Sequence, residues 1–297
     1  MIVPAYRDLP NGDAKGVFGD DDVLGTLNRQ TPEAVALAAT SVRSGKVFSL
    51  NAPMELPDPP LFDRGPFAHH VYQTRMGNRD DWVDNFYPQS SSQWDGFLHI
   101  AEPEIGSYNH QPPHRLGIEG WARRGIAGRG ILLDVERHLA TQGETLHWHT
   151  ERPITVEELE ATRVAQGVEW REGDVLALRT GWWTGYLAAD AEERDDVRTR
   201  HDSPGLRAGA EMAAYLWDNG ISAAVADNVS VESMPLGPEL LHHLTLCRLG
   251  MPWGEMWWLD ALAQDCADEG RWDFLLVSAP WNLTGGIGSP ANALALR

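Results

Sequence analysis

Short apolar segments alternate with helix-forming segments along the second half of the chain, and this alternation limits the fold more than any other feature. Segments typical of buried strands lie at 130–135, 174–180, 221–227 and 274–279. Strands that alternate with helices predict an α/β protein. No break in composition separates two parts. We therefore expect one domain over 1–297, with a mixed sheet or barrel-like core flanked by helices and an N-terminal loop or arm over 1–30.

Residues that begin and end helices support this pattern. Thr155 and Glu158 have the spacing of a capping box, which predicts a helix from there to about Gly167. The pair Ser203-Pro204 similarly predicts a helix that runs to about Gly220. Further helices are expected over 31–44, 238–249 and 257–268, and earlier strands over 46–51 and 69–75.

The chain is strongly acidic, with 24 lysines and arginines, 43 aspartates and glutamates and a formal charge of −19. Binding to nucleic acid or to an anionic membrane surface needs the opposite charge, so both are excluded as partners. No segment approaches the ~18 apolar residues of a membrane span, and residues 1–30 lack the apolar core of a signal peptide. We expect a cytoplasmic protein that acts on a small molecule, with Cys247 and Cys266 as reduced packing residues.

Several common catalytic motifs are absent from the sequence: a G-x-S-x-G elbow, a P-loop and an H-E-x-x-H helix. Residues 286–291 spell a dinucleotide-binding fingerprint, but only six residues follow, too few for the helix and strand of that unit. His147 and His149 have the spacing of two ligands on one strand face, yet their polar neighbours favour a solvated loop.

The segment 88–99, PQSSSQWDGFLH, is the first that combines metal-binding and acid–base residue types. In an extended chain Gln93 and Asp95 point to the same side, and His99 follows four residues later. A carboxylate and an imidazole at this spacing suit a divalent cation or a positioned general base. The alternative is a structural loop in which glutamine and serine side chains bond to each other.

A second candidate lies in the expected helix over 238–249. His243 follows Leu240 by three residues and precedes Cys247 by four, so helical spacing places it on the apolar side, with His242 off that side. A histidine in such a place is either a functional group or a hydrogen-bonded core residue.

Glu255 is the strongest candidate on physical grounds. Its neighbours in the sequence are Trp253, Met256, Trp257 and Trp258. A carboxylate among large apolar side chains needs a cation, a metal ion or a raised pKa. The chain contains 13 tryptophans, so part of this excess is expected to form the wall of a site.

Taken together, these residues resemble the cyclase family, which includes metal-dependent kynurenine formamidases and isatin hydrolases. The family hallmark is H-x-G-T-H-x-D-x-P-x-H. Asp95 and His99 match its Asp and its last His. Gln89 and Gln93 occupy its first two His positions, and Phe97 replaces its Pro.

The resemblance continues along the chain. The later His and Glu of the family fall on His243 and Glu255. The closing segment 285–292, GGIGSPAN, resembles the G-x-G-S-P ending of the family, and residues 22–32 resemble the start of its longer members.

The resemblance implies a metal-dependent hydrolase of an amide, ester or lactone bond, active as a homodimer or higher homo-oligomer. It implies a divalent metal ion, Zn²⁺ or Mn²⁺, and His99 as the general acid and base. The implied metal ligands are Asp95, His243 and Glu255, with Gln93 and Gln89 at the replaced positions. An aromatic substrate would meet Trp94, Trp253 and Trp257.

The two glutamines keep other interpretations open. A carboxamide oxygen is an uncharged ligand that suits a hard cation better than Zn²⁺ and weakens the case for two metal ions. A lyase or cyclase could use His99 without hydrolysis. A non-catalytic relative could retain the fold and bind no metal ion.

Overall fold

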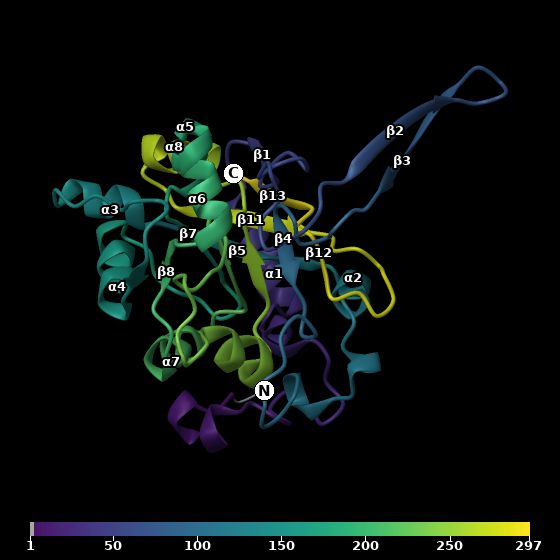
Figure 1. Ribbon diagram of the computed structural model, residues 1–297. Helices are drawn as coiled ribbons and strands as arrows, with labels where there is room; N and C mark the ends of the chain where they lie inside the picture. Colours follow the sequence, from purple (N-terminus) through teal and green to yellow (C-terminus); the bar gives the residue numbers. More distant parts are fainter. Residues whose placement is uncertain (1–2) are drawn as a thin grey trace.

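A nine-stranded mixed sheet runs through the body of the computed structural model, which describes residues 3–297 (Figure 1). In spatial order its strands are β1 (Val47–Ser49), β13 (Ala293–Leu296), β11 (Asp273–Ser278), β5 (Ile126–Asp134), β7 (Val175–Arg179), β9 (Ala223–Ala226), β10 (Trp253–Glu255), β4 (Gln93–Asp95) and β12 (Gly288–Pro290). The four strands β5, β7, β9 and β10 are parallel, and the other pairings are antiparallel. The expected mixed α/β architecture is confirmed, with the sheet curled into a half-barrel.

The two central parallel strands β7 and β9 are largely apolar, with Arg179 at the end of β7, because helices and loops cover both faces of the sheet. Every residue of β7 and β9 is buried. Both strands lie inside the segments that the sequence predicted. β5 begins at Ile126, four residues earlier than expected. Its residues 126–131 pair with β11, on the side of β5 that faces away from β7, and this pairing extends the strand.

Helices lie against the sheet, with α5 and α8 near its upper end and α7 near its lower end in Figure 1. Their bounds are α1 (Pro32–Ala38), α2 (Glu119–Arg124), α3 (Val135–Thr141), α4 (Val156–Ala165), α5 (Trp182–Ala188), α6 (Ala191–Arg200), α7 (Ala210–Asp218) and α8 (Asp260–Glu269). Short 3₁₀ helices lie at Tyr6–Asp8, Pro10–Gly12, Gly25–Arg29, Ala39–Ser41, Tyr108–His110 and Pro113–Arg115, and a π-helix at His243–Leu249.

The capping box that opens α4 is present as predicted. The Glu158 backbone N–H donates to Thr155 Oγ1 at 3.2 Å, and the Thr155 N–H donates to Glu158 Oε2 at 2.9 Å. This local signal predicts a helix correctly because both partners lie within one turn.

The helix expected from Ser203-Pro204 is wrong at its start. Pro204–Leu206 form the strand β8, which pairs in parallel with β6 (Arg152–Ile154). The helix α7 begins only at Ala210, after Gly209 with φ +140°. The buried Leu206 and its backbone bond to Val231 O hold this segment extended, so tertiary pairing overrides the local helix signal.

Two further features lie outside the main sheet. The strands β2 (Ala68–Gln73) and β3 (Arg79–Asp84) form a hairpin that projects from the body (Figure 1). The N-terminal loop packs on the end of the π-helix, where Ala14 N–H donates to Arg248 O at 2.9 Å. Among the described residues, no helix is long and apolar enough to span a membrane.

Candidate active site

The pairing of β4 with β10 places the central acidic residues on one face of the sheet. Gln93 lies opposite Glu255, and Asp95 lies opposite Trp253. Alternate residues of a strand share a face, so these four side chains point the same way while Trp94 points to the other face. The sheet register therefore brings together Asp95 and Glu255, which are 160 positions apart in the sequence.

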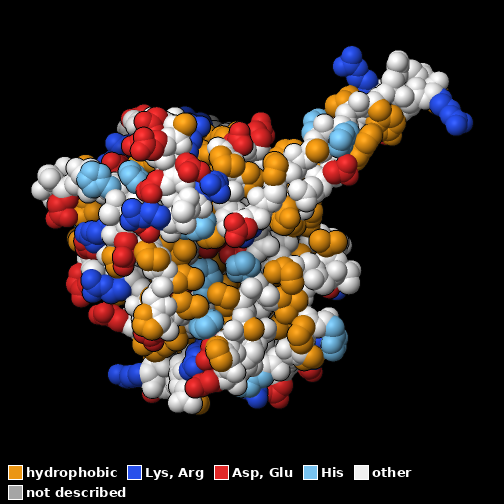
Figure 2. All heavy atoms as spheres, viewed as in Figure 1, with side chains coloured by type: hydrophobic (Ala, Val, Ile, Leu, Met, Phe, Trp, Pro, Cys, Tyr) orange, Lys and Arg blue, Asp and Glu red, His pale blue; other side chains and the backbone are white. Residues whose placement is uncertain are grey.

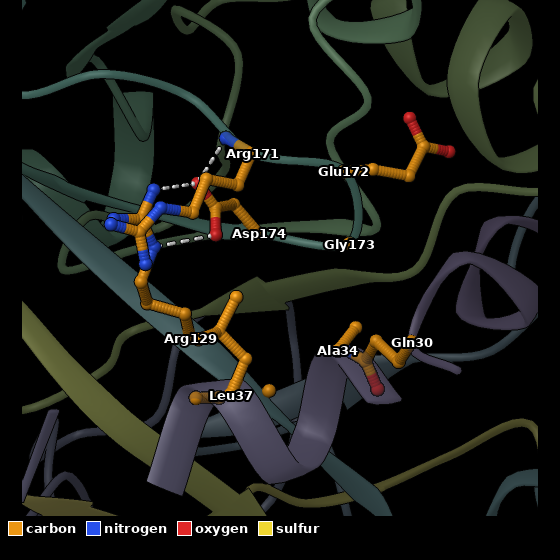
Figure 3. A pocket seen from close by; sticks show the side chains of 10 residues that line it. Gln30, Ala34, Leu37, Arg129, Arg171, Glu172, Gly173 and Asp174 are labelled. Atoms are coloured by element: carbon orange, nitrogen blue, oxygen red, sulfur yellow. Dashed lines mark hydrogen bonds and ion pairs between the residues drawn. The ribbon is translucent and has the colours of Figure 1, made fainter. Parts of the chain in front are cut away.

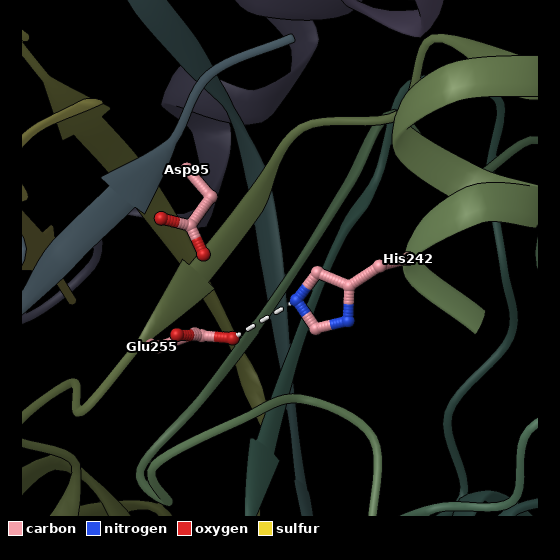
Figure 4. A group of neighbouring side chains, drawn as sticks. All are labelled: Asp95, His242 and Glu255. Atoms are coloured by element: carbon pink, nitrogen blue, oxygen red, sulfur yellow. Dashed lines mark ion pairs between the residues drawn. The ribbon is translucent and has the colours of Figure 1, made fainter. Parts of the chain in front are cut away.

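His242 completes a three-residue cluster with Asp95 and Glu255 (Figure 4). One potential ligand atom from each residue lies within 4.8 Å of the others, and all three residues are buried. His242 Nε2 lies 3.3 Å from Glu255 Oε1. The helix end that carries the histidine and the two paired strands thus meet at a single point in the fold.

The structure places His242 in this cluster, in place of the expected His243. His242 is buried in the cluster, whereas His243 is partly exposed. The spacing argument assumed 3.6 residues per turn, but the segment that starts at His243 is a π-helix with wider turns. A periodicity of 3.6 residues per turn consequently does not describe which of the two histidines reaches the cluster.

Glu232, which sequence reasoning missed, fixes the position of His242. Its carboxylate accepts the backbone N–H groups of Leu241 and His242 at 2.8 and 3.1 Å, and it also contacts His242 Nδ1. A histidine that ligates a metal ion commonly donates its other N–H to a carboxylate, which fixes the tautomer. Glu232 leaves Nε2 of the ring facing Asp95 and Glu255. The sequence offers no local signal for this role.

Gln89 and Gln93 bond to the carboxylates through their amide groups. Gln93 Nε2 donates to Glu255 Oε2 at 2.7 Å, and Gln89 Nε2 donates to Asp95 Oδ1 at 2.9 Å. Among the described residues, Asp95 Oδ2 and Gln93 Oε1 are buried without a hydrogen-bond partner. Two unpaired buried acceptors beside a histidine nitrogen and a carboxylate fit one divalent cation.

The charges of the cluster also favour a cation. Burial raises the pKa of Glu255, and the neighbouring Asp95 raises it further. Burial alone would lower the pKa of His242, but its bonds to Glu232 and Glu255 outweigh this and raise it to about 10. The carboxylates of the site therefore carry more negative charge than His242 can neutralise. A divalent cation would reduce the repulsion between Asp95 and Glu255.

His99 lies beside this cluster at the edge of a cavity. Its Nδ1 is 2.6 Å from Gln89 Nε2 and 3.8 Å from Asp95 Oδ1, and the side chain is 27% exposed. The ring centres of His99 and His242 are 6.4 Å apart. Gln89 thus contacts both Asp95 and His99 and fixes their relative positions.

The cavity has a volume of about 280 Å³ and opens onto the cluster. Its lining combines apolar side chains with a few polar ones: Phe62, Ile100, Val229, Met234 and Leu236 with Arg64, His99, Ser230, His242 and Glu255. Arg64, a second residue that sequence reasoning missed, donates to Gln89 O. It lies in a proline-rich loop, where no periodicity marks a functional residue.

The three tryptophans that were expected to contact substrate lie away from this cavity. In the described part of the chain, Trp94, Trp253 and Trp257 are fully buried and none of them lines this cavity. Trp94 Nε1 donates to Ser278 Oγ on the far face of the sheet, and Trp257 Nε1 donates to Gln93 O, both at 2.9 Å. Trp253 packs on His242 with ring centres 4.5 Å apart. Trp253 and Trp257 thus contact site residues, whereas Trp94 packs on the opposite face of the sheet.

A smaller hollow of about 50 Å³ lies between α1 and the ends of β5 and β7 (Figure 3). Arg129 and Asp174 form a buried ion pair there, with Arg129 Nε donating to Asp174 Oδ1 at 2.9 Å. Because Arg129 and Asp174 pair with each other, this hollow is explained by the packing of α1 against the ends of these two central strands.

Comparison with known proteins agrees with the fold. The model of the family named Cyclase matches residues 48–233. A crystal structure described as a novel cyclase is 30% identical with a TM-score of 0.85, covering 96% of this chain and 99% of that chain. No curated protein matches the chain significantly.

Two more distant structures share the architecture. Isatin hydrolase A from Ralstonia solanacearum is 16% identical with a TM-score of 0.61, covering 89% of this chain and 95% of that one. A structure described as a predicted metal-dependent hydrolase from Bacillus stearothermophilus is 18% identical with a TM-score of 0.51, covering 84% of this chain and 97% of that one. Since the family model spans more than half of the sequence, the chain belongs to the cyclase family.

Proposed function

We propose that this protein is a metal-dependent hydrolase that cleaves an amide, ester or lactone bond of a small, mainly apolar molecule. The observation that carries the proposal is the buried cluster of Asp95, His242 and Glu255 at the floor of a cavity. Burying two carboxylates side by side destabilises a fold unless a cation offsets them. Such a cost is typical of a functional site.

Asp95, His242 and Glu255 would hold the cation, with Gln93 Oε1 as a further oxygen donor. When bound, a divalent cation polarises the scissile carbonyl and lowers the pKa of water. Three oxygen donors against one nitrogen favour a hard cation, so Mn²⁺ fits this set better than Zn²⁺. Gln89 donates its amide to Asp95 and serves to orient that carboxylate rather than to ligate.

His99 is positioned to act as the general base and acid. Its ring borders the cavity, and Gln89 restrains it through Nδ1. In this role His99 takes a proton from the attacking water and returns it to the leaving amine or alkoxide. Proton transfer by a positioned side chain contributes roughly 10²–10⁴-fold to such rates.

The cavity indicates the class of substrate. A volume of about 280 Å³ with an apolar wall suits a single flat or branched molecule, near the lower end of the range for ligand pockets. Arg64 is the cationic side chain on this wall, and it suits a carbonyl or carboxylate oxygen of the substrate. The isatin hydrolases of the same fold suggest a cyclic amide as the first compound to test.

The test begins with metal content and activity on one preparation. The protein is stripped with chelator, loaded with Mn²⁺ or Zn²⁺, and assayed with isatin, an N-formylaniline and a lactone. Metal-dependent turnover with ¹⁸O from labelled water in the product supports hydrolysis. Turnover without label indicates the lyase or cyclase alternative.

Two variants sharpen the result. His99→Ala should lose roughly 10²-fold or more in kcat while it retains bound metal. His114→Ala, at an exposed position outside the cavity lining, serves as the matched control. Activity that survives both metal removal and His99→Ala contradicts the proposal, and absence of any metal binding favours the non-catalytic alternative.

A further inference from the structure

A tight turn at residues 61–64 presents Arg64 to the cavity. The backbone N–H of Arg64 donates to Leu61 O at 3.2 Å, and the two residues between them, Phe62 and Asp63, have φ values of +58° and +56°. Glycine, asparagine and aspartate favour this left-handed region, whereas a bulky residue such as phenylalanine rarely adopts it. Such a conformation persists only where contacts outside the turn stabilise it, and it is typical of functional sites.

His201 supplies these contacts from the end of α6. Its ring stacks on that of Phe62 with centres 4.3 Å apart and planes at 8°, and its Nε2 accepts the Phe62 backbone N–H at 3.2 Å. The His201 N–H donates to Val197 O at 2.8 Å, which fixes the histidine to the helix. Figure 2 shows histidine side chains among hydrophobic ones near the middle of the body, and this pair is a contact of that kind. His201 thus holds Phe62, which lies 139 positions earlier in the sequence.

Phe62 in turn supports Arg64. The guanidinium carbon lies 5.2 Å from the centre of the Phe62 ring, a distance typical of a cation–π contact, and the guanidinium also donates to Gln89 O. In the described part of the chain, Phe62 and Arg64 line the cavity and His201 does not. A series of contacts therefore leads from His201, outside the cavity, to a charged group on its wall.

Arg64 carries a positive charge that is available to a ligand. Within residues 3–297, its guanidinium forms no ion pair, and only Nη1 donates a hydrogen bond, to Gln89 O. The buried Arg129, by contrast, is paired with Asp174. Burial lowers the pKa of Arg64, yet an arginine remains charged at neutral pH. Its Nε and Nη2 have the planar geometry that matches the two oxygens of a carboxylate.

We propose that His201 is a positioning residue of the active site, which holds Phe62 so that the Arg64 guanidinium faces the cavity and binds a carboxylate of the substrate. The substrate part of this inference rests on the proposed function, whereas the contact between His201 and the turn does not. His201 must be neutral for this role, because a protonated imidazole has N–H groups at both nitrogens and cannot accept the Phe62 N–H. The substrate then carries a carboxylate in addition to the bond that is cleaved.

The surroundings of His201 favour its neutral form. Burial lowers the pKa of the imidazole below its ordinary value, and the positive charges of Arg198 and Arg64 act in the same direction. Asp63 and Asp202 oppose this shift without reversing it. The hydrogen bond from the turn to the imidazole is therefore fully present at neutral pH, and it is lost as the pH falls through the lowered pKa.

Amide hydrogen exchange tests the contact without any ligand. At neutral pH, the Phe62 N–H of the wild type should exchange roughly 10-fold or more slowly than that of His201→Leu, which has no acceptor. His201→Gln should retain the protection, because its amide oxygen can replace Nε2. As the pH falls, protection relative to the intrinsic exchange rate should decrease in the wild type with the pKa that NMR assigns to His201. It should stay constant in His201→Gln, which has no imidazole to protonate.

Benzoate and its uncharged analogue benzamide test what Arg64 binds, in titrations with and without Mn²⁺. Arg64→Met should raise the benzoate dissociation constant roughly 10-fold or more and change that of benzamide by less than about 2-fold. His201→Leu should show the same selective loss, and His201→Gln should restore the affinity. With an N-formylaminobenzoate as substrate, His201→Leu should raise KM more than it lowers kcat. His147→Leu, at an exposed position outside the cavity lining, is the matched control.

Three results would overturn the inference. The first is a Phe62 N–H that exchanges equally fast in the wild type and in His201→Leu. The second is a benzoate affinity that Arg64→Met leaves unchanged, or no benzoate binding with or without Mn²⁺. The third is a loss of benzoate affinity in His201→Leu that His201→Gln does not restore, since that pattern indicates a general structural role. A protein that hydrolyses no substrate contradicts the proposed function, and the exchange and benzoate measurements still decide this inference.

Discussion

Gln93 Nε2 donates a hydrogen bond to Glu255 Oε2 at 2.7 Å across the pairing of β4 with β10. The bond occupies one oxygen of a buried carboxylate and leaves Gln93 Oε1 unpaired. A glutamine at this position therefore orients Glu255 and also offers one further acceptor to a cation. In the proposed metal site, Gln93 would thus supply an oxygen ligand at the motif position where the resemblance implies a histidine.

The first prediction concerns the carboxylates. Mn²⁺ at 100 times its dissociation constant should stabilise the wild type by about 2.7 kcal/mol and raise its Tm. Asp95→Asn should show no such shift, because it removes a charged ligand. Its metal-free form should match or exceed the stability of the metal-free wild type, since repulsion of Glu255 is relieved. Thermal unfolding with and without Mn²⁺ measures both effects.

The exposed Glu211→Gln serves as the control for the loss of one negative charge, and it should keep the full metal-induced shift. An Asp95→Asn protein that still gains stability from Mn²⁺ would show that the cation binds elsewhere.

A second prediction distinguishes two adjacent histidines. His242→Gln should abolish metal binding, because His242 supplies the nitrogen of the cluster. His243→Gln should leave metal binding unchanged, because that side chain lies outside it. Isothermal titration with Mn²⁺ compares the two variants directly. An equal loss of Mn²⁺ binding in both variants would show that His243 also contributes to the metal site.

The third prediction addresses Glu232. Glu232→Gln retains the size of the side chain but weakens the interaction that fixes the His242 ring. Partners of this kind typically contribute 10–100-fold to metal affinity, so the dissociation constant should rise by about that factor. Unfolding by urea in the absence of metal serves as the comparison. A change in stability with no change in metal affinity would make Glu232 purely structural.

A fourth prediction follows from the two cysteines. Burial raises the pKa of Cys247 to about 11 and that of Cys266 to about 12. At pH 9, a thiol with a pKa of 11 is only about 1% thiolate, against about three-quarters for an ordinary thiol, and the thiolate is the reactive form. Native protein should therefore react very slowly with a thiol reagent between pH 7 and 9. Denatured protein should release two thiols rapidly, and fast native labelling would contradict this burial.

The fifth prediction tests the ion pair beneath β5 and β7. Asp174→Ala leaves the buried Arg129 guanidinium without its carboxylate and should destabilise the fold by about 3–5 kcal/mol. The exposed pair of Arg198 and Asp195 is the matched comparison, and Asp195→Ala should cost about 1 kcal/mol or less. Urea unfolding of both variants measures the loss in the free energy of unfolding. Similar losses would mean that burial adds little to the contribution of the Arg129–Asp174 ion pair.

Much of the fold could be predicted from local sequence. The continuous apolar runs that became β7 and β9 identify buried parallel strands, since every residue there faces a covered side of the sheet. The capping box of Thr155 and Glu158 likewise depends on residues within one turn. The start of α7 was misjudged because the pairing of β8 with β6 involves residues about 50 positions away.

The candidate site divides in the same way. The sequence by itself proposed Glu255, because a carboxylate in apolar surroundings requires a partner, and proposed Asp95 and His99 from their spacing and from the family motif. Only the tertiary structure selected His242 over His243 and brought in Glu232. The geometry of a π-helix and the register between β4 and β10 depend on long-range packing. Local sequence shows which residues need a polar or charged partner. The pairing of the strands in the folded sheet determines which of these residues come into contact.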